Sequence, residues 1–179
     1  MQIISLNLTR NDLANRFTGI GAEIGVEQGV FSEMICQTGK VKKLYSIDAW
    51  KAYSGYRDHT RQKKLDLFYE ISRDRLKPYN CELVRKFSQD AAQDFGNESL
   101  DFIYIDANHD YQHVYEDLTL WTPKVKKGGI ISGHDYIRRK GQDRYYAVIS
   151  AVNDFAAKNN TTELVIYRGD APPNWTFIK

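Results

Sequence analysis

The feature that most constrains the fold is a strand–turn–helix–strand pattern over residues 17–50. Residues 21–26 have the composition of a short buried strand that runs into a turn. A helix is predicted over residues 30–37, and a second apolar run over residues 43–47 completes a βαβ unit. Ligands of open α/β sheets bind outside the carboxyl ends of the strands. The pattern therefore predicts an α/β fold with a ligand site at that edge of the sheet.

Two glycines and one acid give this unit the chemistry of a nucleoside site. Gly25 and Gly29 bracket the turn, where the lack of a Cβ lets the backbone approach a ligand closely. Asp48 ends the second strand, and its carboxylate can accept hydrogen bonds from ribose hydroxyls. A dinucleotide fingerprint would need three glycines as G-x-G-x-x-G, and a P-loop would need Lys followed by Ser or Thr. Neither is present, so no cradle for a pyrophosphate is predicted.

Length and composition fit one soluble domain over residues 1–179, with residues 1–18 as a short N-terminal helical segment. The chain is long enough to bury a two- or three-layer core, and a hydrophobic content of 42% is ordinary for a globular protein. A formal charge of +2 argues against a nucleic-acid partner. No apolar run approaches the roughly 18 residues that cross a bilayer, and no signal peptide is recognised. A cytoplasmic location without membrane contact is expected.

Strands and helices alternate along the rest of the chain. Helices are predicted over residues 60–76, 114–121 and 145–158, and further strands over residues 81–85, 102–105, 130–132, 162–167 and 174–178. The N-terminal segment either covers the ligand or packs on the sheet edge. Trp50, Tyr53 and Tyr56 follow the ribose acid, where they either flank a bound ligand or close the end of the sheet.

Two later strands each end in an acid and an imidazole. Asp106 and His109 follow one buried strand, and His134 and Asp135 follow the next. Carboxylate oxygens and an imidazole with open positions suit a divalent ion such as Mg, Mn or Fe. The alternatives are that Asp106 acts near a bound ligand without a metal and that His134 and Asp135 cap a loop. His59 and His113 are expected to be solvated.

The spacing E-x-G-x-x-x-G from Glu23 to Gly29, with an acid about 20 residues later, resembles the class I S-adenosylmethionine-dependent methyltransferases. The resemblance implies a Rossmann-like, seven-stranded, mostly parallel sheet with an antiparallel last strand and helices on both faces. It also implies S-adenosylmethionine as cofactor. The expected cofactor-binding residues are Glu23, Gly25, Val26, Gly29, Asp48, Ala49, Phe87, Ser88 and Asp106. The alternative for Glu23 is that it is only a strand residue.

A narrower resemblance rests on IDANHDY and KKGGIISGHDY. These stretches look like those of the macrolide and antibiotic-sugar O-methyltransferases and of the cephalosporin hydroxylase-like proteins. The resemblance implies a Mg site formed by Asp106 and the pair His134–Asp135. Two departures stand out: His134 replaces an acid, which favours transition metals, and Asn108 replaces the expected general base. His109 is the nearest substitute base, with Asp106 as the second catalytic residue.

Methyl transfer to a small hydroxylated, sugar-like acceptor is the function that these features favour, with or without a divalent metal. One alternative is a nucleoside-binding module that has lost catalysis, and another is a metal-dependent, hydroxylase-like relative. The expected partner is the small-molecule acceptor, whose pocket would involve residues 50–57 and 137–146. The acceptor's identity, the metal and any homo-oligomer remain open from sequence alone.

Overall fold

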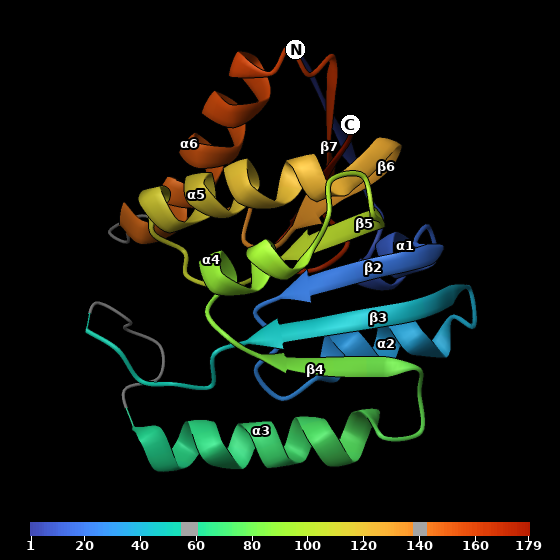
Figure 1. Cartoon of the computed structure of the whole chain (residues 1–179). Helices are drawn as coiled ribbons and strands as arrows, with labels where there is room; N and C mark the ends of the chain where they lie inside the picture. The colour runs from blue at the N-terminus through green and yellow to red at the C-terminus, as the bar shows by residue number, and fades with distance from the viewer. Residues whose placement is uncertain (55–60, 138–142) are drawn as a thin grey trace.

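A computed structural model describes residues 1–54, 61–137 and 143–179 (Figure 1). Tyr56 and His59 lie outside the described residues, as do parts of both loops predicted to shape the acceptor pocket. Within the described residues, no helix has both the length and the apolar composition needed to cross a membrane.

Among the residues that the structure describes, eight strands form one sheet, in the order β1-β7-β8-β6-β5-β2-β3-β4. Their bounds are β1 Gln2–Leu6, β2 Gly19–Ile24, β3 Val41–Asp48, β4 Cys81–Arg85, β5 Leu100–Ile105, β6 Val125–Gly133, β7 Glu163–Tyr167 and β8 Asn174–Ile178. All neighbours pair in parallel except β8, which runs antiparallel to both β6 and β7. The predicted mostly parallel sheet with an antiparallel last strand is confirmed, with one strand more than the seven predicted.

The additional strand lies in the N-terminal segment, where only a helix was predicted. Gln2 to Leu6 pair in parallel with β7 at the sheet edge, and the helix that follows is confined to five residues. The prediction missed β1 because its side chains are mostly exposed, so no period-2 apolar pattern marks it. Pairing with β7, over 150 residues away, supplies the hydrogen bonds that make it a strand.

Helices cover both faces of the sheet, as predicted (Figure 1). Their bounds are α1 Arg10–Ala14, α2 Val30–Gln37, α3 Gln62–Leu76, α4 Ser88–Ala91, α5 Tyr111–Trp121 and α6 Asp143–Lys158, with short 3₁₀ turns at Ala92–Asp94 and Thr122–Lys124. In Figure 1, α4 and α5 lie in front of the sheet and α2 lies behind it, while the arrowheads of β2, β3 and β4 all point to the left.

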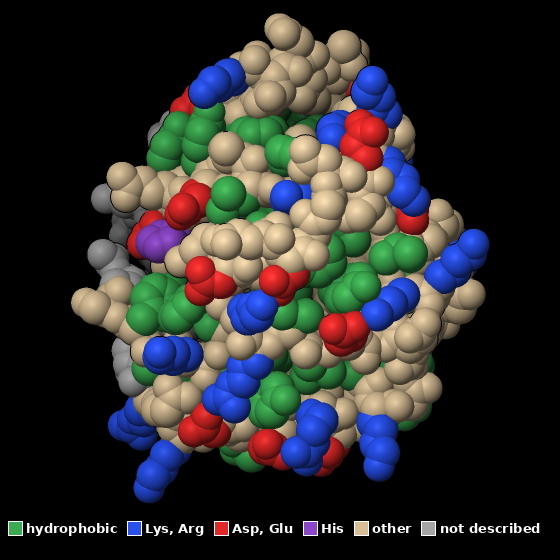
Figure 2. Space-filling view, viewed as in Figure 1, with side chains coloured by type: hydrophobic (Ala, Val, Ile, Leu, Met, Phe, Trp, Pro, Cys, Tyr) green, Lys and Arg blue, Asp and Glu red, His purple; other side chains and the backbone are tan. Residues whose placement is uncertain are grey.

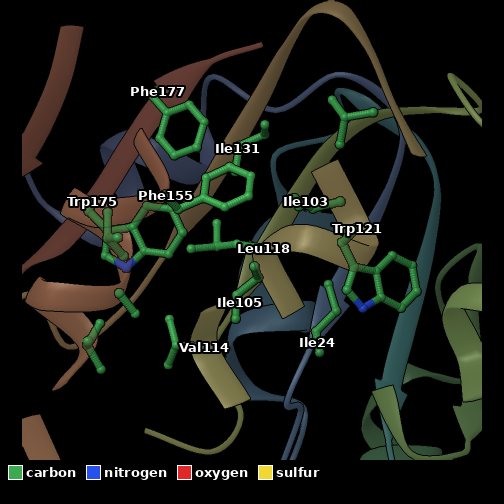
Figure 3. Close-up of a cluster of buried hydrophobic side chains, with 14 of the residues drawn as sticks. Ile24, Ile103, Ile105, Val114, Leu118, Trp121, Ile131, Phe155, Trp175 and Phe177 are labelled. Atoms are coloured by element: carbon green, nitrogen blue, oxygen red, sulfur yellow. The ribbon is translucent and has the colours of Figure 1, made fainter. Parts of the chain in front are cut away.

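The main core lies between the sheet and the helices α5 and α6 (Figure 3). On α5, Val114, Leu118 and Trp121 follow the i, i+4, i+7 spacing of one helix face and are buried against Ile103 and Ile105 of β5. Burying each such side chain contributes about 1.5–3 kcal/mol. This packing fixes α5 against the face of the sheet, with its first turn near the end of β5.

On the opposite face, a buried polar group lies beneath α2. Glu23 of β2 is buried and accepts a hydrogen bond from the hydroxyl of Ser32 on α2, and Ser32 is in turn 2.6 Å from the hydroxyl of Ser46 on β3. Burial raises the pKa of Glu23 to about 8, although the Ser32 hydrogen bond and the charge of Arg10 oppose it. Glu23 therefore holds a proton in the folded protein at pH values where the unfolded chain has lost it.

Replacing Glu23 with glutamine is expected to flatten the dependence of stability on pH. The unfolded pKa of Glu is about 4.3, so the wild-type free energy of unfolding should fall as pH rises from about 4.5 to 8, at up to about 1.4 kcal/mol per pH unit. Glu23→Gln lacks this group, so its stability relative to wild type should rise across that window. Urea unfolding at several pH values measures the effect, and parallel profiles for the two proteins would refute the assignment.

Candidate functional site

A cavity of about 290 Å³ opens at the carboxyl ends of the central strands. The turn after β2, the ends of β3 and β5, the segment after β4 and helix α5 all contribute to its lining. Figure 2, in the same view as Figure 1, shows a histidine beside acidic side chains on the side to which the arrowheads point. Of the residues predicted from the sequence, those that line the cavity are Gly25, Asp48, Ala49, Phe87, Ser88, Asp106 and His109.

The turn after β2 lies directly against the tip of β5. Gly25 has φ of 91° and donates its N–H to the carbonyl of Ile47 at 2.9 Å. A Cβ at this position would lie 2.1 Å from the backbone oxygen of Asp106. Only glycine combines this φ with this contact, and the contact joins the predicted nucleoside site to the predicted acid cluster.

Asp48 organises the same turn through its carboxylate. One oxygen accepts the N–H groups of Val26 and Glu27, each at 3.0 Å, and the other accepts the N–H of Trp50 at 2.8 Å. A carboxylate offers about four acceptor positions, so these bonds leave about one for a ribose hydroxyl. Asp48 thus shapes the cavity wall besides offering an acceptor to a ligand.

Three other residues of the predicted cofactor set do not line the cavity. Glu23 is buried under α2, Val26 packs in a small apolar cluster with Trp50, and Gly29 caps the start of α2. Their direct contact with a cofactor stays a prediction. Trp50 is fully buried and donates its indole N–H to the carbonyl of Glu27 at 2.8 Å, so it supports the turn from beneath, while Tyr53 does line the cavity.

The end of the cavity next to β4 is aromatic on one side and acidic on the other. The rings of Tyr53 and Phe87 meet edge to face with centroids 5.5 Å apart. Opposite them, Asp117 of α5 is buried and accepts a hydrogen bond from the hydroxyl of Ser88. Burial raises the pKa of Asp117 to about 7. Sequence reasoning missed Asp117, although an acid on the apolar face of a predicted helix is a signal that could have found it.

At the other end, four titratable side chains that follow β5 and β6 converge. Asp106 and His109 line the cavity, whereas His134 and Asp135 lie behind them and do not line it. The His109 Nε2 lies 2.9 Å from the Asp135 Oδ2 and 3.4 Å from the Asp106 Oδ1. The His134 Nδ1 lies 3.3 Å from the Asp135 Oδ2 and 3.6 Å from the Asp106 Oδ2. The predicted meeting of the two strand tips is therefore present in the structure.

Arg10 of α1 completes this cluster and was missed by sequence reasoning. Its Nη2 donates to the Asp106 Oδ2 at 2.9 Å, and its guanidinium lies 3.9 Å from the ring centroid of Phe31 and 4.9 Å from that of Tyr104. Such cation–π contacts stabilise a desolvated guanidinium. Arg10 lies 96 positions before Asp106, so no local pattern could pair the two.

The cluster sets the charge of its own members. Burial alone would raise the pKa values of Asp106 and Asp135, but hydrogen bonds from the two histidines outweigh this effect. As a result, the pKa of Asp106 lies well below its usual range and that of Asp135 is about 2. Burial alone would lower the pKa values of the histidines, but the carboxylates raise that of His109 to about 10 and that of His134 to about 9. His109 therefore carries a proton near neutral pH, which does not favour its predicted role as a general base in this state.

The donor set fits a divalent ion. Asp106, His134 and Asp135 each place one ligand atom within 4.8 Å of the others, and two carboxylates with one imidazole suit Mn, Fe or Mg. Arg10 and the two histidines balance the negative charge of the two carboxylates in this structure. Asn108 lines the cavity beside this cluster, with its amide N donating to the Tyr53 hydroxyl at 3.1 Å and its amide O accepting the Asp110 N–H at 3.0 Å.

Known structures show the same fold with low sequence identity. An O-methyltransferase from Bacillus cereus, solved in complex with SAH, superposes with a TM-score of 0.67 at 17% identity, covering 95% of this chain and 79% of that one. Spermidine synthase from Thermotoga maritima superposes with the same score of 0.67 at 11% identity, covering 97% of this chain and 58% of that one. The fold is thus shared by proteins with different names and activities, and it does not by itself set the reaction.

Among curated proteins, uncharacterized protein R132 of Acanthamoeba polyphaga mimivirus is 28% identical over 141 residues, which is 75% of this chain and 58% of that protein. Uncharacterized protein y4gI of Sinorhizobium fredii is 21% identical over 76% of this chain and 15% of its own length. The chain thus spans only part of the length of these relatives. The family described as a methyltransferase domain matches residues 22–136, which include the glycine turn, the cavity and both strand tips. The resemblance to methyltransferases drawn from the sequence is confirmed, and the chain belongs to this methyltransferase domain family.

Proposed function

We propose that the protein is an S-adenosylmethionine-dependent methyltransferase that acts on a hydroxyl group of a small, sugar-like molecule. The observation that carries the proposal is that Gly25, Asp48, Phe87 and Asp106 line one cavity. A nucleoside needs an open backbone approach, a ribose acceptor and an apolar wall for the base, and Gly25, Asp48 and Phe87 supply these in that order along the sheet edge. The SAH bound to the Bacillus cereus protein of the same fold supports this choice.

The cavity suggests how the cofactor lies. The base fits between Phe87, Tyr53 and the buried Asp117 of α5, and the ribose fits beside Asp48. The methionyl part then extends past Gly25 towards Asp106, because β2 lies between β3 and β5 in the sheet. This orientation brings the sulfonium methyl group to the acid–imidazole cluster, which consists of Asp106, His109, His134 and Asp135. The acceptor would bind on this side of the cofactor.

The reaction is an in-line displacement at the methyl carbon. A bond forms between the acceptor oxygen and the methyl carbon, the carbon–sulfur bond breaks, and its electron pair stays on the sulfur, giving SAH. The hydroxyl proton passes to a side chain of the cluster. His109 is the side chain assigned this role from the sequence, and it can act only in its neutral form. Alignment of the acceptor by the cluster is the main contribution of the protein.

Asp106, His134 and Asp135 are the residues that would hold a divalent ion. Such an ion would supply Lewis-acid polarisation that makes an acceptor hydroxyl more acidic. Two neighbouring hydroxyls on the acceptor would suit the open positions of the ion.

The decisive experiment combines binding with turnover. Calorimetry with SAH tests the cofactor site, and transfer of labelled methyl from S-adenosylmethionine to a panel of monosaccharides and other small diols tests the reaction, with and without Mn²⁺. Binding together with transfer is the expected result. Absence of SAH binding by the folded protein would overturn the proposal.

A second candidate is a cofactor-binding module without transferase activity. It is favoured by Asn108, whose amide cannot accept a proton, and by the protonation of His109 between two carboxylates. In the experiment above, this candidate predicts SAH binding without methyl transfer to any acceptor of the panel.

Replacing Asp48 with asparagine is expected to weaken SAH binding by about tenfold or more, because an NH₂ group would face backbone N–H donors and remove the ribose acceptor. Asp101→Asn is a matched control, since the Asp101 carboxylate also accepts a backbone N–H, that of Ile20 at 2.7 Å, but at the opposite ends of the strands. Calorimetry on both variants, with thermal unfolding as a check on folding, measures the effect. Unchanged affinity in a folded Asp48→Asn protein would remove Asp48 from the site.

Mn²⁺ is expected to bind to the wild-type protein, and Asp135→Asn is expected to weaken this binding by about tenfold or more, because one carboxylate ligand is lost. Asn suits the position, since Asp135 has φ of 58° and Asn tolerates this left-handed conformation. Electron paramagnetic resonance measures free Mn²⁺, and Asp101→Asn again serves as the control. Equal Mn²⁺ binding by wild type and Asp135→Asn would exclude the predicted ligand set.

A further inference from the structure

The wall of the cavity formed by α5 presents hydrogen-bond acceptors in a defined arrangement. Three side chains form a chain in which each has a fixed role: the Trp121 indole, the Ser88 hydroxyl and the Asp117 carboxylate. Ser88 and Asp117 both line the cavity, at the end away from the acid–imidazole cluster. The direction of the hydrogen bonds in this chain determines which chemical group the wall can recognise.

The direction is fixed by Trp121 together with the ionised carboxylate of Asp117, which can only accept. An indole N–H can only donate, and it donates to the Ser88 oxygen at 2.8 Å. The Ser88 hydroxyl donates its own proton to one oxygen of Asp117. Ser88 therefore has no proton left for a ligand and can offer only an acceptor lone pair to the cavity.

Asp117 is also left with an acceptor. Its side chain is buried, with 6% of its surface exposed, and within the described part of the chain no group donates to its second carboxylate oxygen. Because Asp117 lines the cavity, this oxygen is available to a ligand. A ligand that brings an N–H group to this wall would satisfy it.

The surroundings select a flat aromatic ligand. Phe87, Tyr53, Ile47 and Leu65 also line the cavity, and the edge-to-face pair of Phe87 and Tyr53 next to Ser88 gives it an aromatic side. A purine base placed against this side would turn its edge towards Ser88 and Asp117.

We infer that Asp117 is a specificity-determining residue that recognises the exocyclic amino group of adenine in the cofactor. The inference rests on the proposed function. An amino group at the six position of the purine donates to the free oxygen of Asp117, whereas a carbonyl at the same position would face acceptors alone. The wall therefore accepts an adenine nucleoside and rejects a hypoxanthine nucleoside.

The test compares the binding of S-adenosylhomocysteine with that of S-inosylhomocysteine, which carries a carbonyl in place of the amino group. Calorimetry is done at pH 8.5, where the Asp117 carboxyl, whose pKa burial raises to about 7, is ionised. Wild type is expected to bind the adenine compound at least about tenfold more tightly. Asp117→Asn is expected to reduce this preference to threefold or less, mainly by weakening the binding of the adenine compound.

Two further variants separate recognition from support of the fold. Asp154→Asn is the matched control. The Asp154 carboxylate also accepts a hydrogen bond from a hydroxyl of α5, that of Tyr111 at 3.0 Å, but it is exposed and does not line the cavity. This variant should keep the wild-type preference for the adenine compound. Ser88→Ala removes the partner of Asp117 but leaves the carboxylate, so the preference for adenine should persist even if both affinities fall. A purely supporting role of the Ser88–Asp117 pair predicts instead that Ser88→Ala and Asp117→Asn behave alike.

The outcomes distinguish the two proposals. Three results would overturn the role of Asp117 and leave the methyltransferase proposal intact. They are equal binding of both compounds by wild type, an undiminished preference for the adenine compound in Asp117→Asn, and a lost preference in Ser88→Ala. Binding of neither compound by wild type overturns both.

Discussion

The close contact between the Gly25 turn and the backbone of Asp106 is the constraint on which the site depends. Because no side chain separates the two, the tip of β2 lies against the tip of β5, and Asp106 donates its N–H to the carbonyl of Ile24 at 2.7 Å. Asp106, directly after β5, thus borders the proposed nucleoside cavity and belongs to the acid–imidazole cluster at once. A side chain at position 25 would push these two parts away from each other.

Electrostatic balance within the cluster is the second determinant of what the site can do. Two buried carboxylates would repel each other, and here two imidazoles and the guanidinium of Arg10 hold them together. The two carboxylates and the imidazole of His134 are also the ligands that a divalent ion would need. A bound ion and the internal cations therefore compete for the same oxygens, and Arg10, which comes from the N-terminal segment, couples that segment to the chemistry of the site.

Helix α5 serves the core and the site with adjacent residues. Leu118 and Trp121 are fully buried in the core, while Asp117, between them and the cavity, faces Ser88. Trp121 connects the two roles, because its ring packs in the core and its N–H fixes the direction of the hydrogen bonds at the cavity wall. A core residue thus influences which base the proposed site accepts.

The local patterns of the sequence determined much of this protein. The glycine turn, the helix over residues 30–37 and the acids at the ends of three strands follow from periodicity and from residue chemistry close in the chain, so the α/β fold and the edge that carries the site were predictable. Tertiary structure alone decided the rest. It made Gln2–Leu6 a strand by pairing it with β7, joined Arg10 to Asp106, directed Asp117 into the cavity and gave His109 two carboxylate neighbours that keep it protonated. These features depend on contacts between residues far apart in the chain, or on burial in a low-dielectric site, and neither leaves a local pattern in the sequence.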